Sequence, residues 1–124
     1  MPLLIFLVED NATIRDNLLP ALAELAGAEV LAHAETEVAA TEWLDSHVGA
    51  LDLVIIDLLL KNGSGFGVLR HFKARRPDTA LVILSNYATP IMRERAAALG
   101  ATAVFDKSTE LEAFFEFCAG LNRR

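Results

Sequence analysis

The sequence is short of cysteine and of long apolar runs. It contains one cysteine, Cys118, among 124 residues. A single thiol cannot close an internal disulfide, so the chain makes no demand for an oxidising compartment, and we expect a cytoplasmic location. No run approaches the roughly 20 consecutive apolar residues that a membrane helix needs, so no membrane partner is expected. The apolar opening over residues 3–8 lacks the basic residues of a signal peptide and is interpreted as a buried strand.

Basic residues are also scarce. The chain has 11 Lys and Arg against 17 Asp and Glu, a net charge of -6, and its internal basic cluster is confined to residues 73–76. A nucleic acid backbone would be repelled on average, so we expect no direct nucleic acid partner. The three histidines, His33, His47 and His71, share no metal-ligand spacing with Cys118, which argues against a zinc site.

What the sequence does contain is an alternation of apolar runs and segments of helical period. Hydrophobic residues make up 53% of the chain, whose length is that of one domain. Runs rich in Ile, Val and Leu are typical of strands buried on both faces, and the alternation predicts an α/β domain with a parallel sheet. The predicted strands cover residues 3–8, 29–34, 51–56, 80–84 and 101–105, and the first three predicted helices cover 12–25, 37–47 and 66–74.

Local signals predict where some helices begin and end. Thr89 followed by a proline is typical of a helix start, and Thr109 with Glu112 predicts a capping box for the last helix. Pro20 lies inside the first predicted helix, where it removes a backbone hydrogen bond, so it is expected to kink the helix or delay its start.

Polar side chains follow four of the five predicted strands: Glu9 and Asp10, Asp57, Ser85 and Lys107. The carboxyl ends of parallel strands meet at one edge of the sheet, where ligands bind. Converging carboxylates repel one another and favour a divalent cation, and oxygen ligands favour Mg²⁺ over zinc. Lys107 can supply positive charge to phosphoryl oxygens and Ser85 a hydroxyl donor, so Asp57 can attack phosphorus and form an acyl phosphate.

The motifs at these strand ends resemble those of a known family. They are "VEDN" (8–11), "VIIDLLLKNGSG" (54–65), "LSN" (84–86) and "FDKS" (105–108). In order and spacing they resemble the receiver domain of bacterial two-component response regulators, at the size of a stand-alone, chemotaxis-regulator-like protein. The resemblance implies a single receiver domain over residues 1–124, with a flavodoxin-like, doubly wound, five-stranded parallel sheet in order 2-1-3-4-5 and five helices.

The resemblance also implies a function and a role for each site residue. A sensor histidine kinase or a histidine phosphotransfer protein would donate a phosphoryl group to the domain, which would then change its binding to a downstream protein target. The domain would be regulatory rather than an enzyme, although it would catalyse its own phosphorylation and dephosphorylation. Asp57 matches the phosphoacceptor, Lys107 the phosphate-binding lysine and Ser85 the hydroxyl switch residue. The Mg²⁺ site is matched by Asp10, Glu9, Asp57 and the backbone carbonyl of Leu59. Gly65 matches the glycine that opens the third helix.

Four positions depart from the family pattern. Lys61 replaces a frequent proline, so the loop after Asp57 is expected to be stiffened differently. Asn86 replaces a small residue and is expected to narrow access to the phosphorylation site. Val104 replaces the switch aromatic, which predicts a muted rearrangement or one that uses Tyr87. Ser108 replaces the proline after Lys107, and a cis bond before a non-proline residue costs about 2.5–4 kcal/mol.

Two other functions stay open on the sequence alone. A phosphate-independent, receiver-like interaction domain would not need the intact set of Asp10, Asp57, Ser85 and Lys107. An aspartate-dependent phosphohydrolase typically carries a second acid two residues after its nucleophile, where this chain has Leu59.

The glycine-rich segment after Asp57 does not indicate a dinucleotide site. Residues 63–67 read "GSGFG", and Val68 stands where the last glycine of G-x-G-x-x-G would be.

Overall fold

The computed structural model describes residues 2–122, which form five strands and five helices in alternation. The strands are parallel neighbours in the order β2-β1-β3-β4-β5, which confirms the predicted flavodoxin-like sheet. The elements are β1 (Leu3–Val8), α1 (Ala12–Ala26), β2 (Ala28–Ala34), α2 (Glu37–Ser46), β3 (Leu53–Ile56), α3 (Gly65–Arg75), β4 (Ala80–Ser85), α4 (Pro90–Ala98), β5 (Ala103–Asp106) and α5 (Leu111–Asn122).

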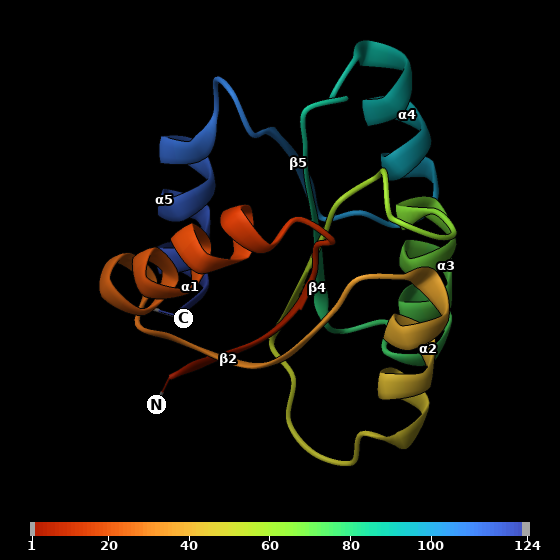
Figure 1. Ribbon diagram of the computed structural model, residues 1–124, viewed down its shortest axis with the longest axis horizontal. Helices are drawn as coiled ribbons and strands as arrows, with labels where there is room; N and C mark the ends of the chain where they lie inside the picture. Colours follow the sequence, from red (N-terminus) through yellow and green to blue (C-terminus); the bar gives the residue numbers. More distant parts are fainter. Residues whose placement is uncertain (1, 123–124) are drawn as a thin grey trace.

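The helices cover both faces of the sheet. Figure 1 shows α1 and α5 on one face and α2, α3 and α4 on the other. Successive side chains of a strand point to opposite faces, so β1 contributes Phe6 and Val8 to one core and Ile5 and Leu7 to the other. Burial on both faces is the reason that the central strands are uniformly apolar.

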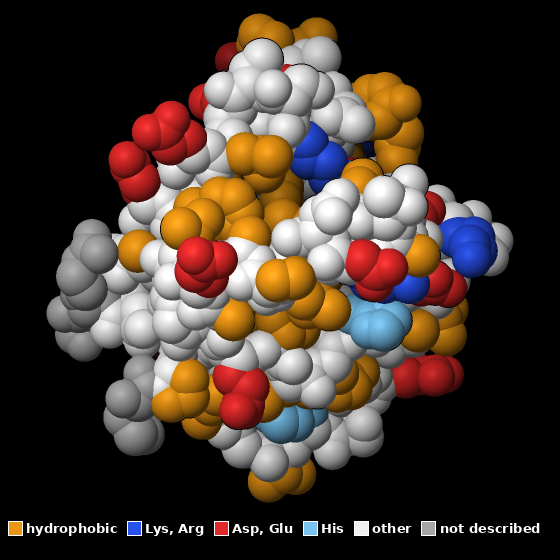
Figure 2. All heavy atoms as spheres, turned by 60° about the vertical axis from the view of Figure 1, so that its left-hand side comes forward, with side chains coloured by type: hydrophobic (Ala, Val, Ile, Leu, Met, Phe, Trp, Pro, Cys, Tyr) orange, Lys and Arg blue, Asp and Glu red, His pale blue; other side chains and the backbone are white. Residues whose placement is uncertain are grey.

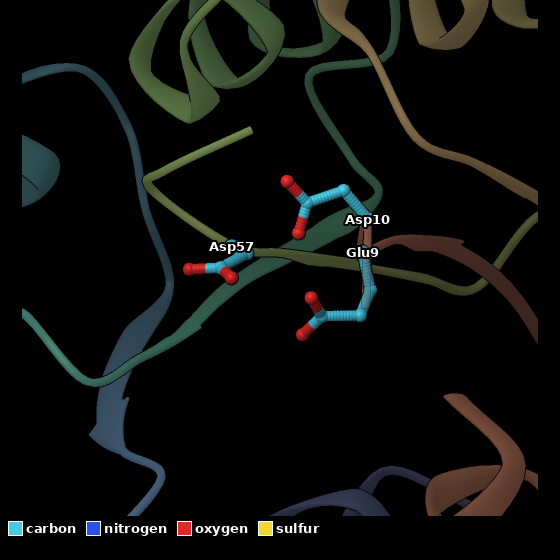
Figure 3. A group of neighbouring side chains, drawn as sticks. All are labelled: Glu9, Asp10 and Asp57. Atoms are coloured by element: carbon cyan, nitrogen blue, oxygen red, sulfur yellow. The ribbon is translucent and has the colours of Figure 1, made fainter. Parts of the chain in front are cut away.

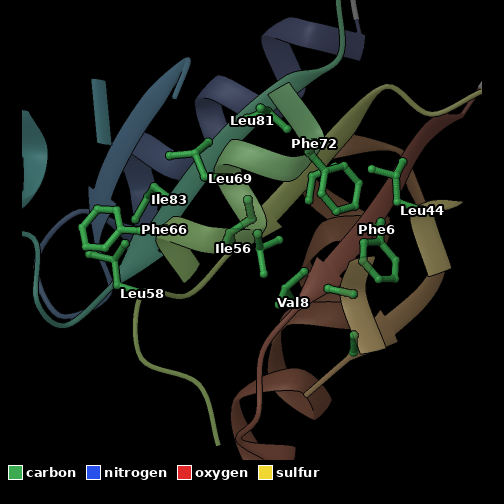
Figure 4. Close-up of a cluster of buried hydrophobic side chains, with 14 of the residues drawn as sticks. Phe6, Val8, Leu44, Ile56, Leu58, Phe66, Leu69, Phe72, Leu81 and Ile83 are labelled. Carbon is green, nitrogen blue, oxygen red and sulfur yellow. The ribbon is translucent and has the colours of Figure 1, made fainter. Parts of the chain in front are cut away.

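The core beneath α2, α3 and α4 contains the buried rings of Phe6, Phe66 and Phe72 (Figure 4). Phe6 stacks on Trp43 of α2 with a ring centroid separation of 4.0 Å and also contacts Phe72 of α3 at 5.8 Å. Cys118 lies in the opposite core, where burial raises the pKa of its thiol to about 12. This cysteine is therefore a packing residue rather than a nucleophile.

The face formed by α1 and α5 carries apolar side chains between acidic ones (Figure 2). A groove there is lined by Leu25 of α1 and by Leu111, Phe115 and Ala119 of α5. No helix within residues 2–122 combines the length and the apolar character needed to cross a membrane.

Some local predictions differ from the structure, and the fifth strand, predicted over residues 101–105, covers Ala103–Asp106. The third strand begins at Leu53 rather than at residue 51, because the Asp52 carboxylate accepts the N–H of Leu4 (2.8 Å) and closes that end of the sheet. The Thr109 capping box is wrong: α5 begins at Leu111, and Asp106 Oδ1 accepts the N–H of Thr109 (3.2 Å) in the preceding turn.

Pro20 does not delay the start of the first helix, which was one of its two predicted effects. The helix begins at Ala12, capped by the Asn11 side chain, and continues through Pro20 to Ala26. Both Pro20 and Asp16, whose carbonyl loses its usual partner, are exposed. Water can therefore bind the free carbonyl, which makes the proline tolerable.

Candidate functional site

Three carboxylates meet at the carboxyl edge of the sheet (Figure 3). Glu9 and Asp10 follow β1, Asp57 follows β3, and one oxygen of each lies within 4.8 Å of the others. Hydrogen bonds of the sheet type continue past the strands and hold the backbone here. The N–H of Asp57 donates to Val8 O (3.0 Å), and that of Glu9 donates to Ala34 O (3.0 Å).

Lys107 reaches the same cluster from the end of β5. Its Nζ donates to Glu9 Oε1 (2.5 Å) and to Asp57 Oδ2 (2.9 Å), and its side chain is only 10% exposed. The backbone N–H of Lys107 donates to Ser85 O (3.1 Å), which fixes the loop beside β4. The structure thus brings together four of the residues predicted from the strand ends.

Burial and charge act in opposite directions on the titrating groups of this cluster. Burial raises the pKa of Glu9, and the negative charge of Asp57 adds to that effect, while the hydrogen bond from Lys107 partly offsets it. Burial would lower the pKa of Lys107, but its hydrogen bonds to Glu9 and Asp57 and the negative charges of these two carboxylates together outweigh burial, and the pKa is raised. The lysine therefore stays an ammonium ion within the cluster.

The donor set fits a hard divalent cation. Its ligand atoms are carboxylate oxygens, without imidazole or thiolate, and one ammonium does not neutralise three carboxylates. Such a site suits Mg²⁺ or Ca²⁺ better than zinc. Leu59, whose carbonyl is a further predicted ligand, pairs with Ser64 in an isolated antiparallel bridge that closes the loop after Asp57.

Ser85 ends β4 and is fully buried. Its Oγ accepts the backbone N–H of Tyr87 (3.1 Å), which leaves the hydroxyl proton free for another acceptor. Tyr87 is 52% exposed, and its contact with the Ser85 hydroxyl is made by its backbone N–H and not by its ring.

Comparison with known proteins agrees with the fold. Residues 5–118 match the family model of the response regulator receiver domain. The chain belongs to this family. It is a receiver domain of two-component response regulators, a regulatory phosphoacceptor domain.

Individual relatives support the assignment of the receiver domain. The DNA-binding transcriptional regulator NtrC of Azospirillum brasilense is 32% identical over 108 residues, which are 87% of this chain and 22% of that protein. The phosphorylated cyanobacterial phytochrome response regulator RcpA has the same fold (TM-score 0.80, 24% identity, 99% of this chain and 93% of that chain). A Burkholderia pseudomallei response regulator with a phosphorylated aspartic acid, calcium ion and citrate also matches (TM-score 0.78, 22% identity, 90% and 63%).

Two of the departures from the receiver pattern contact each other. Ser108 Oγ donates to Asn86 Oδ1 (3.0 Å), which joins the loop after β4 to the loop after β5. No peptide bond within residues 2–122 is cis, so the bond between Lys107 and Ser108 is trans.

Arg93 lies beside Val104 of this receiver domain, a contact that the sequence did not predict. Arg93 of α4 donates from Nη1 to Val104 O (3.1 Å), from Nε to Ala88 O (2.9 Å) and from Nη2 to Glu110 Oε1 (2.5 Å). The same carboxylate oxygen accepts the N–H of Asp106 (2.9 Å). The Arg93 side chain therefore ties α4 to β5 at Val104, the predicted switch position, and no sequence signal distinguishes this arginine from a solvated one.

Glu110→Gln is expected to destabilise the protein at neutral pH, by an amount that shrinks as the pH is lowered through the pKa of the folded-state carboxyl. The hydrogen bond from Arg93 lowers the pKa of the Glu110 carboxyl. Its stabilisation is therefore complete above the pKa of the unfolded state and is lost as the pH falls through the pKa of the folded state. Urea unfolding of both proteins across this range measures the difference, and a difference independent of pH would contradict the prediction.

Asp10→Asn is expected to stabilise the metal-free protein by about 0.5–1 kcal/mol, because it removes one of three clustered negative charges. The same change should weaken Mg²⁺ binding by at least about tenfold. Thermal unfolding and titration calorimetry measure the two effects. Asp16→Asn, on the exposed surface of α1, is the matched control. A lower melting temperature for Asp10→Asn alone would show that Asp10 makes a net favourable contact.

Proposed function

We propose that Asp57 accepts a phosphoryl group from a histidine of a sensor kinase or phosphotransfer protein, with Mg²⁺ bound by Asp10, Glu9, Asp57 and the Leu59 carbonyl. The observation that carries this proposal is the placement of the Lys107 ammonium on Asp57 Oδ2 (2.9 Å), within the cluster of three carboxylates. An isolated aspartate at a strand end is usually a turn or cap residue, and would not need such a partner.

The side chains have complementary parts in the transfer. An Asp57 carboxylate oxygen forms a bond to phosphorus as the phosphorus–nitrogen bond of the phosphohistidine breaks, and the bonding pair leaves on the imidazole nitrogen. Mg²⁺, when bound, neutralises charge on the phosphoryl oxygens. Lys107 exchanges its contact with the free carboxylate for one with a phosphoryl oxygen, and the free hydroxyl proton of Ser85 donates to another.

The output of this domain is proposed to be altered binding to a downstream protein in the cytoplasm. Ser85, Val104 and Tyr87 would carry the change from the site to the surface of α4, β5 and α5. Support for a muted switch comes from Val104, which has no ring to move and whose carbonyl is held by Arg93 (3.1 Å). Tyrosine fluorescence reports on Tyr87, the single tyrosine of the chain, and an unchanged signal on phosphorylation would remove it from this role.

The alternative functions are not favoured. The position two residues after Asp57, where a phosphohydrolase would place its second acid, is held by the apolar Leu59, whose side chain is 54% exposed. A decayed site would have no reason to keep the buried ion pairs of Lys107 with Glu9 and Asp57, because replacing a whole buried ion pair by apolar residues often costs no stability.

The test of this function is intact-protein mass spectrometry after incubation with acetyl phosphate, with Mg²⁺ or with a chelator. One phosphoryl adduct that needs Mg²⁺ and is removed by hydroxylamine, which cleaves acyl phosphates, is expected. The same experiment tests self-catalysed phosphorylation and, by the decay of the adduct, self-catalysed dephosphorylation. If small donors give no adduct, beryllium fluoride binding and transfer from a phosphorylated histidine protein are measured next, and failure of all three would refute the proposal.

A further inference from the structure

The loop that follows Asp57 is held by the first residue of α2. Glu37 contacts this loop, residues 58–64, through both its side chain and its backbone. Its Oε1 accepts the N–H of Ser64 (2.8 Å), and its own N–H donates to Asn62 O (3.1 Å). The two contacts hold loop residues that are two positions apart, near the junction of the loop with α3.

Two glycines make room for this carboxylate. A Cβ added at Gly63 would lie 2.4 Å from Glu37 Cβ, and one added at Gly67 would lie 2.3 Å from Glu37 Oε2. Gly63 also has a φ of +83°, which favours glycine. Gly63 and Gly67 of the glycine-rich segment that fails as a dinucleotide motif are therefore explained by the seating of Glu37.

The hydrogen bond between Ser64 and Glu37 is connected to the proposed metal ligand, Leu59, through the backbone of the loop. Ser64 pairs with Leu59 in the antiparallel bridge that closes the loop, and the next N–H, that of Gly65, donates to Leu58 O (3.0 Å). The position of Ser64 thus determines where the backbone of Leu59 lies. Ser64 is also the N-cap of α3, with its Oγ accepting the N–H of Phe66 (3.1 Å), so the loop and the helix are fixed together.

A second polar contact between this loop and the start of α2 is weaker. Lys61, which replaces the frequent proline, pairs with Glu35 at 3.4 Å, and both side chains are substantially exposed (58% and 38%). Ion pairs of this kind contribute little in water. The hydrogen bonds of Glu37, one of them to a backbone N–H, are therefore the stronger restraint on the loop.

We infer that Glu37 is a positioning residue for the phosphorylation site: it holds the loop after Asp57 so that the Leu59 carbonyl is in place for the divalent cation. This inference rests on the proposed function and assigns to Glu37 a role in metal affinity without direct contact to the metal. Without the Glu37 side chain, cation binding would itself have to order the loop, and this cost would lower the affinity for the cation.

The test compares Glu37→Ala with Glu37→Gln, which keeps the acceptor oxygen but removes the charge. Mg²⁺ affinity is measured by titration calorimetry, and the order of the loop by amide hydrogen exchange at residues 59–64 in metal-free protein. Glu37→Ala is expected to weaken Mg²⁺ binding about tenfold and to speed exchange at Ser64. Glu37→Gln is expected to stay within about twofold of wild type, because its hydrogen bond to Ser64 remains.

The outcomes separate this inference from the proposed function. Absence of Mg²⁺ binding by the wild-type protein would refute the proposed function itself. Wild-type affinity in Glu37→Ala would overturn the role of Glu37 alone, and an equal loss in both variants would assign the effect to charge rather than to position.

A second variant tests the inference independently, in case Glu37→Ala does not fold. Gly67→Ala places a methyl group against Glu37 Oε2 and is expected to displace the side chain, with a similar loss of Mg²⁺ affinity. In a protein that already carries Glu37→Ala, the methyl group has nothing to displace and should cause no further loss. Additive losses in the double variant would overturn the inference.

Discussion

Asp57→Asn is expected to abolish the phosphoryl adduct completely while leaving the fold intact. The carboxamide is not a nucleophile toward phosphorus, and the substitution removes one metal ligand. The backbone of residue 57 stays in place, because its N–H bond to Val8 O (3.0 Å) does not involve the side chain. Lys107 keeps its contact with Glu9 (2.5 Å), so the lysine remains in the site.

Mass spectrometry with acetyl phosphate and Mg²⁺ measures this loss, and circular dichroism checks the fold. Asp78→Asn, an exposed aspartate outside the cluster, is the matched control and should form the adduct at the wild-type rate. An adduct that persists in Asp57→Asn, located by peptide mapping on another residue, would contradict the assignment of the phosphoacceptor.

Gly65→Ala is expected to destabilise the protein by about 3 kcal/mol and to impair metal binding. A Cβ at this position would lie 2.1 Å from Asp57 O and 2.8 Å from Leu58 Cα. Both contacts are to backbone at the end of a buried strand, so neither can rotate away as a side chain could. The start of α3 must move instead, which strains the N–H bond from Gly65 to Leu58 O (3.0 Å) and shifts the loop that carries Leu59.

Urea unfolding and Mg²⁺ titration measure the two effects of Gly65→Ala. Gly120→Ala is the control, because a Cβ there meets nothing within 4 Å and the position lies inside α5. That change should be neutral or stabilising by up to about 1 kcal/mol, since alanine is the better helix former. Equal stability of the two variants would show that the turn after Asp57 relaxes without cost.

Local pattern predicted the elements, and it gave the bounds of the strands and of the first three helices to within two residues. Apolar runs without alternation marked the central strands because both of their faces are covered, and the residues directly after them had to share one edge of the sheet. Errors occurred where a side chain overrode the pattern: Asp52 closes the start of β3, and Asp106 takes the N–H of Thr109 before α5.

The contacts of the site depend on groups that carry no local signal. Arg15 donates to Glu9 O (2.8 Å), and Arg93 to Val104 O (3.1 Å), yet in the sequence each is one polar residue on a helix. Glu37 is equally inconspicuous, although two glycines 26 and 30 positions later are needed to seat it. Their partners are determined only when the helices pack.

The sequence by itself determined the α/β alternation, the strand-end position of Asp57 and the membership of a phosphoacceptor family, because these follow from periodicity and from motif spacing within short segments. Only the tertiary structure decided that Lys107 pairs with both Glu9 and Asp57, residues 98 and 50 positions away, and that Glu37 holds Ser64, 27 positions away. The physical reason is that such contacts depend on the order of the strands and the seating of the helices, which bring distant side chains within hydrogen-bonding distance.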